Sequence, residues 1–257
     1  MNVGRIWAVA SNGFREVIRD RILYLIGFFA LLLIIAMRLL PEVATTTSDK
    51  IVIDFGLAAI EILGVIVAVF VGTGLINKEI EKRTVLVLIA KPLSHSEFIL
   101  GKHLGLSGVL GVLIFAMAVT YLFLLSFGRI DYPLPSILVS NLFLFLELCL
   151  ITAVALVFGV FTSSLLATML SFGVYLMGNL SRDLVELGNL SQNSSIQAMT
   201  EGLYLVLPDL SRLNLKNEAV YSILPSPMTL LSNGVYALFY TTILLAIAIL
   251  LFSRRQF

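Results

Sequence analysis

Charge is scarce in this sequence. Only 13% of the 257 residues are charged, whereas a soluble domain carries roughly 25%. Hydrophobic residues make up 59% of the chain, and the mean hydropathy is +1.01. This composition excludes a disordered chain and a conventional soluble enzyme, and it predicts an integral membrane protein. The formal net charge of +1 offers no basic excess that would point to nucleic acid as a partner.

Cysteine and histidine are almost absent as well. The single cysteine, Cys149, excludes an internal disulfide and any metal site built from several cysteines. The only histidines, His95 and His103, fall in a predicted cytoplasmic loop, which excludes an HExxH zinc site and haem ligation within the membrane. Gly101-Lys102 is followed by histidine, so the chain has no phosphate loop for ATP. We therefore expect neither a cofactor nor a catalytic residue in this chain.

Long apolar runs dominate what is present. A transmembrane helix needs about 20 mostly apolar residues, and such runs cover residues 22–40, 57–76, 104–127 and 230–252. As one helix, the further run 137–180 would extend about 66 Å, twice the thickness of a bilayer core. It is predicted to form two helices separated by the polar turn Thr162-Ser163-Ser164. We predict an all-α membrane protein, a single domain over residues 1–257 with six transmembrane helices.

The distribution of lysine and arginine predicts the orientation. Eleven of the 17 basic residues fall in the N-terminal segment, in the loop 77–103 and at the C-terminus, which six spans place on one side. Because basic residues collect on the cytoplasmic side, we expect both termini in the cytoplasm, with the chain crossing a prokaryotic cytoplasmic (inner) membrane.

Three segments remain outside the predicted spans. Residues 1–21 alternate apolar and charged side chains at helical spacing, which favours an amphipathic helix on the membrane surface with Trp7 at headgroup level over a short polar leader. The loop 77–103 is predicted as helix, turn and helix, because Pro92 breaks the chain and Ser94 with Glu97 forms a capping box; a solvated connector is the alternative. The apolar run 203–207 predicts that the extracytoplasmic loop 181–229 folds as a cap on the bundle.

Two carboxylates lie inside predicted spans. Glu147 falls near the bilayer midplane, and Glu61 shares a helical face with Asp54, which is nearer the outer surface. Burying an ionisable residue in a membrane is costly, so each is a candidate for a place in the substrate path. The alternative is a protonated or hydrogen-bonded residue that packs between helices.

The charged loop carries the most specific motif in the chain. Residues 77–102 read NKEIEKRTVLVLIAKPLSHSEFILGK, and this segment resembles the one that follows the second span of ABC-2 type transporter permeases. The Lys-Pro form is similar to the branch named for multicopper enzyme maturation, and His95 stands where the family commonly has arginine. The positions that match the family are Glu79, Thr84, Leu88, Ala90, Pro92, Leu93, Ser94, Glu97, Phe98, Gly101 and Lys102.

The resemblance implies a half-transporter. Two permease chains, identical or different, would pair in the lipid bilayer above two separate ABC ATPase subunits, which would bind ATP and Mg. The loop 77–103 would then be the coupling helix that receives the ATPase motion; Lys91 and Lys102 could instead contact anionic lipid headgroups. The residues expected to couple to the ATPase are Glu79, Glu81, Arg83, Thr84, Lys91, Pro92, Ser94, Glu97, Gly101 and Lys102.

The transport path is expected between the two permease chains. Its apolar lining predicts export of an amphipathic or lipid-like cargo. The candidate path residues are Glu61, Val65, Val69, Glu147, Phe172 and Leu176. Two other functions stay open: a membrane assembly factor or scaffold with no ATPase, and an ion or proton pathway through Asp54, Glu61 and Glu147.

Overall fold

The computed structural model describes residues 2–19, 24–43, 48–81, 94–191 and 193–254. All regular secondary structure within these ranges is helical, which confirms the predicted all-α class. The helices are α1 (Val3–Val17), α2 (Tyr24–Val43), α3 (Ser48–Glu81), α5 (His95–Phe127), α6 (Leu134–Phe161), α7 (Ser164–Asn179), α8 (Ser181–Leu190), α9 (Ser194–Val206), η2 (Leu210–Arg212), α10 (Lys216–Tyr221) and α11 (Pro227–Arg254).

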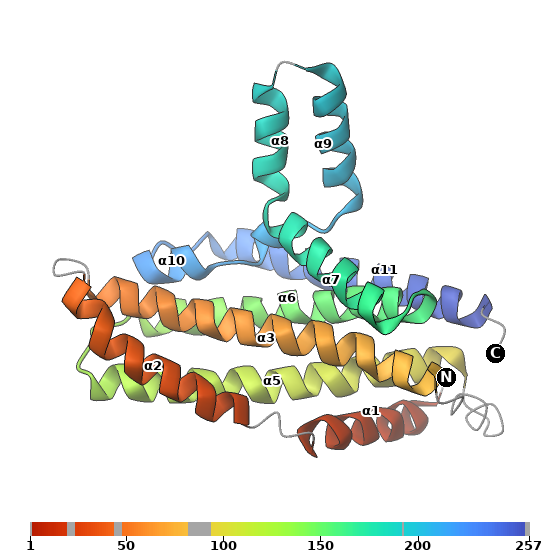
Figure 1. The fold of residues 1–257 in the computed structure, drawn as a ribbon, viewed down its shortest axis with the longest axis horizontal. Helices are drawn as coiled ribbons and strands as arrows, with labels where there is room; N and C mark the ends of the chain where they lie inside the picture. Colours follow the sequence, from red (N-terminus) through yellow and green to blue (C-terminus); the bar gives the residue numbers. More distant parts are fainter. Residues whose placement is uncertain (1, 20–23, 44–47, 82–93, 192, 255–257) are drawn as a thin grey trace.

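Five long helices form the body of the molecule. Figure 1 shows α2, α3, α5, α6 and α11 side by side along the longest axis, with both chain ends at the same end of the bundle, here called the terminal end. Each is long and apolar enough to cross a membrane. In their most apolar stretches, 72% of the α6 residues and 61% of the α3 residues are buried, against 17% in α2. The core is therefore built around α3 and α6.

The fifth predicted span, the second half of the run 137–180, is short and is followed by a bend. The chain turns at Thr162 and Ser163, as the polar interruption predicts, and α7 begins at Ser164. α7 has only 16 residues, and the chain bends by 63° between it and α8. At about 1.5 Å per residue, α7 alone extends about 24 Å, less than a bilayer core. The described residues thus contain five helices that are long and apolar enough to cross a membrane, or six if α7 and α8 together count as one span.

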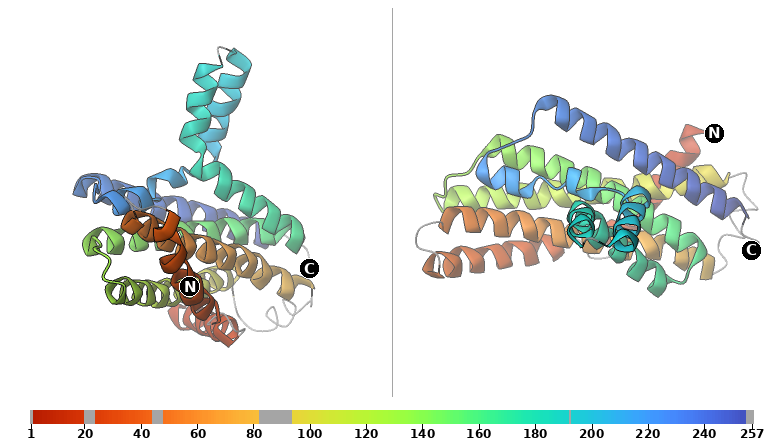
Figure 2. Two further views of the ribbon diagram at one scale, coloured as in Figure 1. Left: turned by 60° about the vertical axis from the view of Figure 1, so that its left-hand side comes forward. Right: turned by 90° about the horizontal axis from the view of Figure 1, so that it is seen from above.

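The loop before the last span differs from the predicted cap. α8 and α9 form a hairpin that projects sideways from the bundle (Figures 1 and 2). The run 203–207 lies at the end of α9, where Leu205 and Val206 are 81% and 74% exposed. The residues that do cover the bundle come later: Leu210, Leu213 and Val220 are buried in its core. The covering segment is therefore η2 and α10.

The charged loop is shorter than predicted, because two spans extend into it. α3 continues to Glu81, and α5 begins at His95 and runs without a break to Phe127. The capping box is confirmed: the Ser94 hydroxyl accepts from the Glu97 amide, and the Glu97 carboxylate accepts from the Ser94 amide. The predicted second helix of the loop is thus the first turns of α5. Residues 82–93 lie outside the described residues.

Candidate functional site

Glu97 joins the start of α5 to the start of the chain. Its Oε1 accepts a hydrogen bond from the Asn2 amide at 2.7 Å, and its Oε2 lies 3.8 Å from the Arg5 guanidinium. The residue is only 3% exposed although it stands in the first turn of a helix. One carboxylate therefore caps α5 and holds the N-terminus of α1 beside it.

Two glycines let α1 approach α5 closely. A Cβ at Gly101 would lie 2.6 Å from the Val9 Cβ, and a Cβ at Gly105 would lie 2.6 Å from the Ala10 carbonyl oxygen. Both distances are shorter than side chains tolerate, so only glycine fits. The spacing of four residues in the sequence predicts such a close helix contact. The structure confirms the contact and identifies the partner as α1.

Lys102 links α5 to two other helices. Its Nζ lies 2.5 Å from Oε1 of Glu79, near the end of α3, and 4.0 Å from Oε2 of Glu16 on α1. The lysine is 2% exposed, and a buried cation is stable only when it is paired. With Glu97 and the two glycines, these contacts form a cluster across α1, α3 and α5 that we call the terminal clamp: Glu16, Glu79, Glu97, Gly101, Lys102 and Gly105.

The terminal clamp changes the roles of several residues expected to touch an ATPase. Glu79, Glu97 and Lys102 face other helices of the same chain. Burial also removes Lys102 from lipid headgroups, the alternative for this residue. Arg83, Thr84, Lys91 and Pro92 lie outside the described residues, and nothing is described of the Glu81 side chain although its backbone ends α3.

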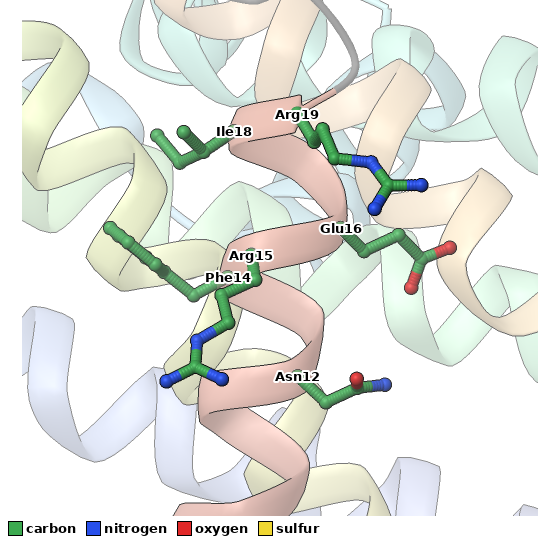
Figure 3. Close-up of a pocket in the computed structure, with 6 residues that line it drawn as sticks. All are labelled: Asn12, Phe14, Arg15, Glu16, Ile18 and Arg19. Carbon is green, nitrogen blue, oxygen red and sulfur yellow. The ribbon is translucent and has the colours of Figure 1, made fainter.

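A hollow of about 710 Å³ lies beside α1. Figure 3 shows Phe14 and Ile18 extending from one side of the helix, and Glu16 and Arg19 from the other. Phe14 and Ile18 pack against the bundle core. Residues 3–17 form a helix, as expected, and Trp7 on it is 73% exposed; the position of this helix on the membrane surface stays a prediction.

The intramembrane carboxylates form a second cluster at the middle of the bundle. Glu61 on α3 accepts hydrogen bonds from the Tyr175 hydroxyl at 2.7 Å and from Nδ2 of Asn214 at 3.0 Å. Its Oε2 lies 3.4 Å from Nζ of Lys216. Glu61 in the core is therefore paired with a lysine from the first position of α10, in the covering segment.

Glu147 stands beside this group on α6. It is 1% exposed, and its Oε1 accepts a hydrogen bond from Nδ2 of Asn179 at 3.0 Å. Asn179 in turn accepts from Asn214, the same residue that bonds Glu61. The two carboxylates expected in the substrate path thus belong to one hydrogen-bonded network.

The apolar residues expected in that path divide between the core and the surface. Val65 and Val69 are 2% and 0% exposed, so within one chain they pack inward and line no open path. Leu176 is 57% exposed, and Phe172, half-buried, meets Phe70 edge to face at 5.8 Å. The outward apolar face of α3 is formed instead by Ile62, Ile66 and Phe70.

Sequence reasoning missed the partners of the carboxylates. Asn214 and Lys216 belong to a loop predicted to be extracytoplasmic, and no pattern places them against a transmembrane helix. Asn179 is the last residue of α7 and lies at the end of the predicted apolar run, where no pattern marks it as a partner of Glu147. Among the described residues, no group of three or more His, Cys, Asp and Glu side chains could hold a metal ion.

One comparison with known proteins identifies a family. A family model described as "ABC-2 family transporter protein" matches residues 7–257. The match covers the terminal clamp, the carboxylate network and the hairpin. No curated protein matches the chain.

Proposed function

Because the chain belongs to the ABC-2 transporter family, we propose that it is the permease subunit of an ABC transporter and that separate ATPase subunits drive it. The protein is an integral, multi-pass membrane protein. ATP and Mg would be bound by the partner, since this chain has no phosphate loop. The terminal end of the bundle, which carries most of the basic residues, would face the cytoplasm and the ATPase.

The terminal clamp is the observation that carries this proposal. Residues 82–93 connect α3 to α5, and the Lys102–Glu79 pair fastens these two helices just beyond the segment. Glu97 and the two glycines fasten α1 to the same place. A force applied to this segment would therefore move three helices together, because buried ion pairs and close backbone contacts resist separate movement. This arrangement suits a lever that an ATPase pushes.

Two copies of the chain would pair through α3 and α7. These helices contact each other, and their outward side chains include Ile62, Phe70 and Leu176. Gly74 on α3 and Gly173 on α7 meet nothing within 4 Å in a single chain, and such open glycines allow a second helix to approach closely. The cargo path would run along this apolar seam, and amphipathic or lipid-like molecules suit it best.

Purification in a mild detergent tests the proposal. We expect an ABC ATPase to co-elute with the chain, and we expect Arg83→Ala to reduce its recovery several-fold, because Arg83 belongs to the charged motif between α3 and α5 in the sequence. Arg38→Ala is the matched control, since Arg38 is an exposed helical arginine at the opposite end of the bundle. A complex that contains no ATPase would instead support a scaffold. Equal recovery with both variants would move the contact elsewhere.

Lys102→Met separates docking from coupling. Lys102 is buried, so its loss should leave the amount of bound ATPase nearly unchanged while ATP-driven transport or cargo-stimulated hydrolysis falls. If the ATPase dissociates from a Lys102→Met protein that remains monodisperse, Lys102 contributes to docking and the lever is wrong.

A further inference from the structure

The two carboxylates of the central network are satisfied unequally. Glu61 receives two hydrogen bonds and faces the ammonium of Lys216. Glu147 receives one hydrogen bond, on Oε1, and among the described residues its buried Oε2 has no hydrogen-bond partner. An ionised carboxylate that is buried without a facing cation carries a large free-energy penalty. Lys216 forms its ion pair with Glu61, and among the described residues Glu147 has no ion-pair partner.

A second unpartnered oxygen borders the same space. Nδ2 of Asn141 donates a hydrogen bond to the Ile137 carbonyl at 2.9 Å. Oδ1 of Asn141 is buried and, in the described part of the chain, has no hydrogen-bond partner. Asn141 and Glu147 both line a cavity of about 10 Å³, roughly the space of one water molecule. Both unpaired atoms are acceptors as long as Glu147 is ionised. The donors on Asn214 and Lys216, which also line the cavity, bond Glu61 and Asn179 and neither of these two oxygens.

We propose that Glu147 is a proton-binding site and carries a proton on Oε2 in this conformation. A proton on Oε2 removes the charge of Glu147 and turns one of the two unpaired oxygens into a donor. Glu61 keeps its ion pair with Lys216. The network then contains one neutral acid, Glu147, beside the ion pair of Glu61 and Lys216. Two carboxyl groups can therefore lie in one buried network that has a single lysine.

The proton exchanges with one side of the bundle only. Asn214 and Lys216 border both the small cavity and a larger polar hollow of about 380 Å³, which Asp54, Asn217 and Glu218 line at the end opposite the chain termini. Toward the terminal end, the α6 side chains in the two turns after Glu147 are buried except for Cys149, and most are apolar: Leu148, Leu150, Ile151, Ala153 and Val154, with Thr152 the exception among the buried ones. The site is therefore a protonation site with one-sided access, in contrast to the ion pathway across the membrane that the sequence left open.

The other helices that pack on α6 bring no further charge to Glu147. The ionisable groups that face it are Glu61 from α3, Tyr175 from α7 and Lys216 from α10. On α5, His103 bonds the Cys149 carbonyl. On α11, Tyr236 bonds the Asp209 amide and Tyr240 bonds the Val206 carbonyl.

Infrared spectroscopy of the purified full chain tests the proposal, because protonated and ionised carboxyl groups absorb at different frequencies. At neutral pH we expect a C=O band of a protonated carboxyl group that shifts to lower frequency in D₂O. The band should disappear in Glu147→Gln and persist in Glu61→Gln. Glu147→Asp, which keeps an acid in a slightly different position, should retain a band at a changed frequency, and size-exclusion chromatography checks that each variant is folded.

Three results would overturn the assignment. The first is a wild-type spectrum without a protonated-carboxyl band at neutral pH, which needs no variant. The second is a band that is unchanged in both Glu147→Gln and Glu147→Asp. The third is thermal stabilisation by sodium or potassium chloride, relative to choline chloride, that Glu147→Gln abolishes, because the site would then hold a metal cation in place of a proton.

Discussion

Asp209 is the residue on which the base of the α8–α9 hairpin depends. Its Oδ2 lies 3.1 Å from Nε of Arg182 and 2.9 Å from Nε of Arg212, and its amide donates to the Tyr236 hydroxyl at 2.7 Å. Burial by itself would raise the pKa of this carboxyl, but hydrogen bonds from Ser211, Arg212 and Arg182 outweigh burial and hold the pKa below its ordinary value of 3.8. The residue thus ties α8, η2 and α11 together as an anion.

Asp209→Asn should lower stability by about 2 kcal/mol at neutral pH, because it removes hydrogen bonds to a charged group. The Arg182 pair contributes little of this, since that arginine is 55% exposed. A carboxyl whose pKa is lower in the folded state stabilises above its unfolded pKa of about 3.9 and loses that effect as the pH falls through the folded value. The difference in melting temperature between wild type and Asp209→Asn should therefore shrink below about pH 4.

Asp183 provides the control for this residue. It is an exposed aspartate on α8, one position after Arg182. Asp183→Asn should unfold like the wild type at every pH. If the difference in melting temperature between wild type and Asp209→Asn stays constant between neutral and acidic pH, the shape of the side chain and not its charge stabilises this position.

At the scale of elements, the contact between α1 and α5 sets the position of the N-terminal helix. Gly105→Ala tests it, because the added Cβ would meet the backbone of Ala10, which cannot rotate away. Helix propensity favours alanine by about 1 kcal/mol, but overpacking costs about 1–3 kcal/mol. We expect a net loss of stability in thermal unfolding. Gly202→Ala is the control, since nothing lies within 4 Å of that helical glycine, and it should be neutral or slightly stabilising.

The same contact shows what the sequence could and could not predict. Apolar run length and the capping box of Ser94 predicted the helices and the start of α5, because both depend on residues that are close in the chain. The four-residue spacing of Gly101 and Gly105 predicted a close contact but carried no information on the partner. Lys102 looked like a surface lysine, because its pairing with Glu79 arises only when α3 and α5 extend beyond the membrane side by side.

The central network was beyond prediction for a related reason. Glu61 and Glu147 were recognisable as isolated carboxylates in apolar runs. Glu61 receives hydrogen bonds from Asn214 and Lys216, which follow it by 153 and 155 residues in a segment that folds back onto the bundle. Glu147 receives its hydrogen bond from Asn179, 32 residues farther along the chain. α7 ends at Asn179, one residue before the end of the predicted run 137–180, so its end was predictable, whereas the contact of Asn179 with Asn214 was not.

At the scale of the whole molecule, the two networks lie at different levels of the same helices. The terminal clamp holds α3 and α5 at the end that carries the chain termini, and the carboxylate network links α3 to α6 near their middle, through Asn214 and Asn179. α3 belongs to both, and most of its apolar stretch is buried. A displacement at the terminal end would therefore reach the central network through α3, which gives the proposed lever a route into the membrane.

Trp7 on α1, the only tryptophan of the chain, reports the depth of the N-terminal helix relative to the membrane. Trp7 and Val3, one turn apart on α1, are 73% and 79% exposed, while Ala10 and Val17 are buried against the bundle. In nanodiscs, we expect lipids brominated near the headgroup to quench Trp7 more strongly than lipids brominated at the chain end. Trp7→Phe combined with Phe115→Trp is the control, because Phe115 lies mid-span on α5, is 71% exposed and should show the reverse order. Stronger quenching by lipids brominated at the chain end, or quenching by acrylamide alone, would place Trp7 and α1 away from the membrane interface.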